Sequence, residues 1–80
     1  MDKRTYLNLI YDYYGELLTE HQRRVFEMYY HDDLSLTEIG ESNGTSKQAV
    51  SDLLRRIEKR LHHYEEKLRL AENELPGTGE

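Results

Sequence analysis

Side chains able to recognise nucleic acid recur at helical spacing between positions 46 and 59. Lys47 and Arg55 can contact guanine edges or backbone phosphate, and Gln48 can pair with adenine. Asp52 can accept a hydrogen bond from cytosine, although its charge repels the phosphate backbone. The residues expected to contact nucleic acid are Ser35, Thr37, Ser46, Lys47, Gln48, Ser51, Asp52, Arg55, Arg56 and Lys59.

Each of these residues also has a plainer interpretation. Ser35 and Thr37 stand at the start of a predicted helix, where hydroxyl and backbone N–H groups can hold a phosphate. Arg56 and Lys59, with Arg60, would extend the electrostatic contact with phosphate. For these three basic residues, a solvated helix face is about as well supported as a contact with nucleic acid.

No grouping of residues indicates catalysis or metal binding. His31, Asp32 and Asp33 are adjacent in the sequence and would need distant partners to surround one ion. His62 and His63 would point about 100° apart on a helix. There is no cysteine, no phosphate-cradling glycine loop and no acid–base constellation. We therefore expect neither an enzyme nor a metal or other cofactor.

Composition predicts one small soluble domain. Eighty residues leave no room for a catalytic cleft of ordinary size, and 36% of them are hydrophobic against 34% charged. No apolar run approaches the ~20 residues of a membrane span, and no secretory signal opens the chain. A cytoplasmic location is expected.

Charge is unevenly distributed along the chain. The net charge of −5 speaks against a simple basic DNA-binding protein, because phosphate contacts require Lys and Arg. The segment 46–63, however, holds five basic residues against Asp52 and Glu58. It is the only positive part of the chain.

Two predicted helices separated by a tight turn place this basic segment in a helix-turn-helix, at about residues 35–60. Ser35 and Glu38 form a capping box that starts the first helix. Gly40 is small enough for the two helices to cross closely. Gly44 tolerates the positive φ of the turn. The spacing is that of a motif whose second helix enters the major groove of DNA.

The second motif helix has two candidate starts. Ser46 is a good N-cap, while Thr45 with Gln48 offers a competing capping box one residue earlier. Asn43 and Thr45 flank the turn glycine where apolar residues commonly fill the gap, so the turn is expected to pack loosely. The residues expected to face inward are Ala49, Val50, Leu53 and Ile57.

Two further helices precede the motif and complete an all-α, four-helix fold. The first is predicted over 3–17, and the second runs from the capping box of Thr19 and Gln22 to about His31. Their apolar stripes are Leu7, Ile10, Tyr11, Tyr14 and Leu18, then Val25, Phe26, Tyr29 and Tyr30.

The last helix is predicted to continue unbroken from about residue 46 to residues 72–74, because Gly and Pro are absent from that stretch. Its apolar heptad pattern outruns the small domain, and Leu61, Tyr64 and Leu68 need a cover. Either the first helix folds back over them or a second chain does. We favour the homodimer. The domain would span 1–72, with a disordered tail at 73–80.

Two resemblances follow from these residues. Residues 18–61 resemble region 4 of bacterial sigma factors, in which a Q-R-x-V helix leads into an L-S-x-x-E-I helix-turn-helix that reads promoter DNA. The chain to about Leu70 is more similar to the YlxM-like family of small bacterial helix-turn-helix proteins. The stretch from Tyr6 to Thr19, the E-x-Y-Y-H-D-D-L-S-L-T-E-I run and the segment 64–68 carry that match.

The YlxM-like resemblance implies a regulatory or accessory protein of the signal recognition particle pathway. Its implied partners are nucleic acid, DNA more than RNA, or components of that particle. Two alternatives remain open. The basic helix could dock on an acidic protein such as the particle's GTPase, or the domain could be a sigma-like transcription regulator.

Overall fold

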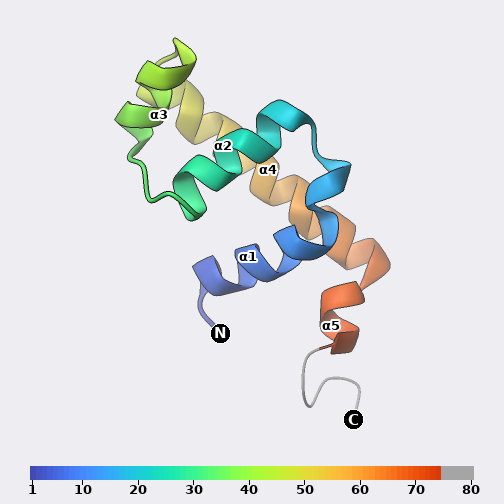
Figure 1. Cartoon of the computed structure of the whole chain (residues 1–80). Helices are drawn as coiled ribbons and strands as arrows, with labels where there is room; N and C mark the ends of the chain where they lie inside the picture. The colour runs from blue at the N-terminus through green and yellow to red at the C-terminus, as the bar shows by residue number, and fades with distance from the viewer. Residues whose placement is uncertain (75–80) are drawn as a thin grey trace.

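The structure, a computed structural model, describes residues 1–74. These residues form helices, turns and loops, with no strand among them. The long helix α4 runs the length of the molecule, with α3 at its N-terminal end, α2 across its middle and α1 nearer its C-terminal end (Figure 1). The all-α prediction is confirmed. The elements are α1 (Lys3–Tyr14), the 3-10 turn η1 (Gly15–Leu17), α2 (Glu20–Tyr30), α3 (Leu36–Asn43), α4 (Lys47–Leu68) and α5 (Leu70–Glu74).

Helix α1 ends at Tyr14, three residues earlier than predicted. The 3-10 turn η1 follows, closed by the Leu18 N–H bonding the Gly15 carbonyl at 3.0 Å. Leu18 and Thr19 are both extended, because Thr19 must cap the start of α2. The chain therefore leaves the helix before them, and it does so at glycine, a weak helix former.

One core joins the helices that precede the motif to the motif itself. The predicted stripe of α1 is buried throughout, as are Val25, Phe26 and Tyr30 of α2. The rings of Tyr11 and Phe26 stack at 4.3 Å between centroids. Ile39 and Val50, which lie where α3 and α4 cross, are 0% and 2% exposed. The helix pair thus shares one buried core with α1 and α2.

Helix α4 stops at Leu68, so the predicted unbroken helix to residues 72–74 is wrong. Arg69 takes a left-handed conformation at φ 53°, and the short helix α5 follows. Asn73 and Glu74, expected in the tail, belong to α5, while 75–80 lie outside the described residues. The cause is tertiary: the Glu65 carboxylate accepts the Ala71 N–H at 3.1 Å and the Glu72 N–H at 2.9 Å.

The second half of the heptad pattern is covered mainly from within the chain. Leu61 is fully buried and cannot lie in a dimer seam in this structure, which corrects that part of the prediction. Helix α1 packs along α4, and the rings of Tyr14 and Tyr64 lie 6.0 Å apart. Only Leu68, at 52% exposed, remains largely open to a partner.

The turn between α3 and α4 borders open space at the surface of the protein. A hollow of about 270 Å³ is lined by residues that include Asn43, Thr45 and Ala49. Ala49 is exposed, contrary to prediction, whereas its neighbour Val50 is buried. Successive residues differ by about 100° around a helix, so only one of the two can point at α3.

Candidate nucleic-acid interface

Helix α4 is positioned by its capping residue and by the turn before it. The Ser46 Oγ accepts the Ala49 N–H at 3.0 Å, so Ser46 is the N-cap and the rival capping box at Thr45 does not form. Gly44 takes the left-handed conformation at φ 70°. A Cβ on Gly40 would lie 2.7 Å from the Thr45 carbonyl oxygen, so only glycine allows this close approach.

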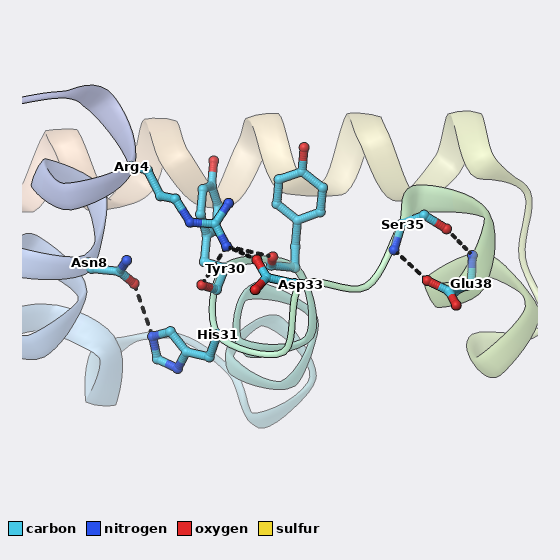
Figure 2. A network of polar contacts seen from close by, with 8 residues as sticks. Arg4, Asn8, Tyr30, His31, Asp33, Ser35 and Glu38 are labelled. Atoms are coloured by element: carbon cyan, nitrogen blue, oxygen red, sulfur yellow. Dashed lines mark hydrogen bonds and ion pairs between the residues drawn. The ribbon is translucent and has the colours of Figure 1, made fainter.

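The loop between α2 and α3 is held by Arg4 of α1 (Figure 2). The Arg4 guanidinium donates to the Tyr30 carbonyl at 2.8 Å and to the Asp33 carboxylate at 2.5 Å. It also lies 5.4 Å from the centre of the Tyr30 ring. Asp33 has a positive φ of 57°, a strained conformation that this ion pair helps to hold. The start of α3 is thereby fixed relative to α1.

Ser35, one of the residues predicted to bind phosphate, already forms hydrogen bonds within the capping box that starts α3. The Ser35 Oγ accepts the Glu38 N–H at 3.0 Å, and the Glu38 carboxylate accepts the Ser35 N–H at 2.8 Å (Figure 2). Thr37 is exposed in the first turn of the same helix. The Ser35 hydroxyl can still donate its own proton, but its backbone N–H is already bonded.

The structure brings three of the predicted contact residues together on the exposed side of α4. The Gln48 amide donates to the Asp52 carboxylate at 3.2 Å, and the Arg55 guanidinium does so at 3.4 Å. Lys47 is exposed in the first turn, and Ser51 is half-buried beside Arg55. Asp52 therefore offsets part of the positive charge of this face.

Glu58, the other acidic residue of the basic segment, is bonded to residues of α1 and α2. Glu58 forms an ion pair with Lys3 at 3.3 Å and accepts the Tyr30 hydroxyl at 2.8 Å. Burial, reinforced by this hydrogen bond, raises the pKa of Tyr30 above its usual range, so the hydroxyl keeps its proton. The Glu58 side chain is only 18% exposed and contributes little negative charge to the outer face.

Arg56 and Lys59, the last two predicted contacts, lie on a different side of α4. They line an open hollow of about 680 Å³ together with Arg60 of the same helix. Gln22 of α2 also lines it, a contact that no pattern in the sequence indicated, because it brings together distant parts of the chain. The other two lining residues are His63 and Tyr64.

The histidines have local structural roles or remain exposed. His31, at the end of α2, pairs with the Asn8 side chain at 3.0 Å (Figure 2). Within residues 1–74, no three His, Cys, Asp or Glu side chains are placed to hold one metal ion. No helix of the described part is both long and apolar enough to cross a membrane.

Comparison with known proteins places this fold in a family. A family model described as "UPF0122: Putative helix-turn-helix protein, YlxM / p13 like" matches residues 1–75. A UPF0122 protein of Clostridium perfringens (strain SM101) is 52% identical over 71 residues, covering 89% of this chain and 63% of the relative. One of Clostridium kluyveri (strain NBRC 12016) is 53% identical over 72 residues, covering 90% and 65%.

The chain thus spans less than two thirds of the length of these two curated relatives. A UPF0122 protein of Clostridium botulinum (strain Alaska E43) is 48% identical over 75 residues, covering 94% of this chain and 69% of the relative. The family match extends over the motif helices and the helices that support them. The chain belongs to the UPF0122 family of YlxM- and p13-like proteins.

Proposed function

We propose that this protein binds nucleic acid, duplex DNA in preference to RNA, through the exposed face of α4 and the start of α3. The role is one of binding and not of catalysis. The observation that carries the proposal is the placement of the basic segment. Lys47, Gln48 and Arg55 are exposed on the second helix of the motif, which follows a close crossing at Gly40 and a turn at Gly44.

Electrostatics supplies most of the affinity in this proposal. Lysine and arginine side chains that neutralise phosphates release condensed counterions, so binding weakens as salt rises. Gln48 and Asp52 are hydrogen-bonded to each other in the free protein. That bond uses one of the two N–H donors of the Gln48 amide, so a second donor and the amide oxygen are left to pair with an adenine edge.

Replacing Lys47 and Arg55 together with Ala should flatten the salt dependence of duplex binding by about two phosphate contacts, or about 1.8 in the slope of log K against log salt. Fluorescence anisotropy at several KCl concentrations measures the slope. The matched control is Arg24→Ala/Lys67→Ala, which removes the same charge from exposed positions elsewhere. Equal slopes for both double variants would contradict the proposal.

The cellular role we propose is that of a cytoplasmic regulatory or accessory protein of the signal recognition particle pathway. The similarity to YlxM-like proteins supports it. The net charge of −5 favours a second candidate, in which the basic helix docks on an acidic protein such as the particle's GTPase. The resemblance to sigma region 4 supports a third, a DNA-binding transcription regulator.

A pull-down from lysate, with and without nuclease, separates these candidates. If the basic face binds nucleic acid, nuclease treatment should abolish capture of partners that are held through it. If the face binds a protein directly, capture should survive nuclease and weaken with Lys47→Ala/Arg55→Ala. Capture that survives nuclease and ignores those substitutions would place the partner site elsewhere on the molecule.

A homodimer stays a prediction, with a smaller interface than the heptad pattern of the sequence predicts. Since Leu61 is buried, the contact would rest on the exposed Leu68 and the half-buried Tyr64. Sedimentation equilibrium at tens of micromolar tests it. Leu68→Glu should dissociate a dimer, and a parent protein that is already monomeric would contradict the prediction.

A further inference from the structure

The side chains that line the open hollow beside α4 can all donate hydrogen bonds. It holds about 680 Å³ and is lined by Gln22, Arg56, Lys59, Arg60, His63 and Tyr64, none of which is acidic. The Gln22 Oε1 accepts the Thr19 N–H at 2.9 Å, so the group that Gln22 can offer a ligand is its NH2 donor. The Tyr64 hydroxyl accepts from Arg60 at 3.3 Å and can still donate its own proton.

The positive charges of the hollow are not balanced within the described part of the chain. Arg56, Lys59 and Arg60 form no ion pair with any residue of 1–74, whereas Arg55 pairs with Asp52. Arg56 stands three and four residues before the other two, a spacing at which like charges on a helix repel each other. A bound anion would relieve that repulsion, so the hollow fits a ligand with several negative charges.

The hollow does not face the same way as the predicted contact residues at the start of α4. At 100° per residue, Arg56, Lys59, Arg60 and His63 centre roughly a quarter turn around α4 from the set Lys47, Gln48, Ser51, Asp52 and Arg55. A helix about 10–12 Å across nearly fills a major groove about 12 Å wide. When one side faces the bases, a side a quarter turn away faces the backbone of one strand.

We propose that this hollow binds consecutive phosphates of one strand of the duplex whose bases face the start of α4. The inference rests on the proposed function and adds a second, sequence-independent contact made jointly by α2 and α4. Arg56, Lys59 and Arg60 supply the charge. Gln22 and Tyr64 donate uncharged hydrogen bonds to phosphate oxygens, which fix where the backbone lies along the helix.

The test uses a fluorescent 24-base-pair duplex of random sequence and a series of KCl concentrations. Arg56→Ala/Lys59→Ala/Arg60→Ala should make the negative slope of log K against log salt shallower by about 2.7, which is three contacts at about 0.9 each. All three side chains are exposed, so the variant should keep the parent fold. The control with the same loss of charge is Arg23→Ala/Arg24→Ala/Lys67→Ala, which should leave the slope close to that of the parent.

A second variant tests the hollow without changing charge. Gln22→Ala/Tyr64→Phe should weaken binding several-fold, equally for all sequences, while the salt slope stays that of the parent. Circular dichroism is needed here, because Gln22 also takes part in the α2 capping box. Tyr64→Phe alone serves as the companion: it leaves the capping box and the charge unchanged but removes one donor, and it should also weaken binding.

Three results would overturn the inference, and they are distinguishable. If the triple variant behaves like its control while Lys47→Ala/Arg55→Ala still flattens the slope, the hollow is not a phosphate site and the proposed function stands. If the uncharged variants bind like the parent, a built site is ruled out in favour of diffuse charge. If the parent itself does not bind the duplex, the proposed function fails together with the inference.

Discussion

At the scale of single residues, Gly40 matters because it lacks a side chain. Its Cβ position lies 2.7 Å from the Thr45 carbonyl oxygen, and a backbone atom cannot move aside as the end of a flexible side chain can. Gly40→Ala should therefore force α3 and α4 apart and lower the free energy of unfolding by about 1–3 kcal/mol. Urea denaturation measures the loss.

Ser42→Ala is the matched control for Gly40→Ala, since Ser42 is an exposed residue of the same helix. It should change the free energy of unfolding by less than about 0.5 kcal/mol. If Gly40→Ala is as harmless as this control, the close crossing of α3 and α4 is wrong. Gly44 differs: a Cβ there would meet no atom within 4 Å, and only its positive φ restricts substitution.

Three tyrosine–glutamate pairs, which no motif in the sequence indicated, make stability depend on alkaline pH. Tyr11 donates to Glu27 at 2.5 Å, Tyr14 to Glu65 at 2.6 Å and Tyr30 to Glu58 at 2.8 Å. Burial, with these hydrogen bonds, raises the pKa of each hydroxyl in the folded protein above the ordinary tyrosine value of about 10. Their stabilisation is complete below pH 10 and is lost as pH rises from there through the raised pKa values.

Tyr30→Phe tests this pH dependence. The variant loses a hydrogen bond at every pH, but it should also lose less stability between pH 10 and 11 than the parent does. One proton corresponds to at most about 1.4 kcal/mol per pH unit. Urea midpoints at pH 8, 10 and 11 give both slopes. Parallel slopes for the two proteins would show that Tyr30 titrates normally.

At the scale of elements, the junction between α4 and α5 depends on one buried carboxylate. Glu65 is 8% exposed and accepts hydrogen bonds from the Tyr14 hydroxyl and from the N–H groups of Ala71 and Glu72. The Tyr14 oxygen in turn accepts the Leu70 N–H at 3.0 Å. Helix α5 is thus tied to α1 and α4 through its first turn.

Glu65→Gln should loosen α5 while leaving the motif helices intact. The amide has one acceptor oxygen in place of two and brings a donor into a site filled with donors, so the free energy of unfolding should fall by about 1–3 kcal/mol. Hydrogen exchange should quicken at Ala71 and Glu72. The exposed Glu66→Gln is the control. Unchanged exchange in Glu65→Gln would show that the Glu65 carboxylate does not hold α5 in place.

Helix starts were predictable from the sequence, whereas the ends of α1 and α4 were not. The capping boxes of Thr19 and Ser35 and the N-cap Ser46 involve residues three apart, so they can be recognised locally. The end of α4 falls at Arg69, which carries no local stop signal. It is produced by Glu65 and Tyr14, and the pairing of Tyr14 with α5 spans most of the chain.

At the scale of the whole molecule, α1 packs along α4 and Leu61 is buried, whereas Leu68 stays exposed and open to a second chain. The heptad pattern fits both a folded-back chain and a two-chain seam, because α1 and a second α4 would bury the same positions. The exposed basic residues of the candidate site could be predicted, since helical spacing separates them from Val50, Leu54 and Ile57. The part played by Gln22 could not be predicted, because its position beside α4 depends on the angle at which α2 crosses α4.

The central claim is that the exposed face of α4 meets nucleic acid. Titrating the ¹⁵N-labelled protein with an unlabelled duplex at low salt, and following every backbone amide by NMR, tests it most directly. The largest shifts should fall on Lys47, Gln48, Ser51 and Arg55, with smaller ones at the start of α3. Shifts confined to α1 and α5, or none at saturating duplex, would contradict the claim.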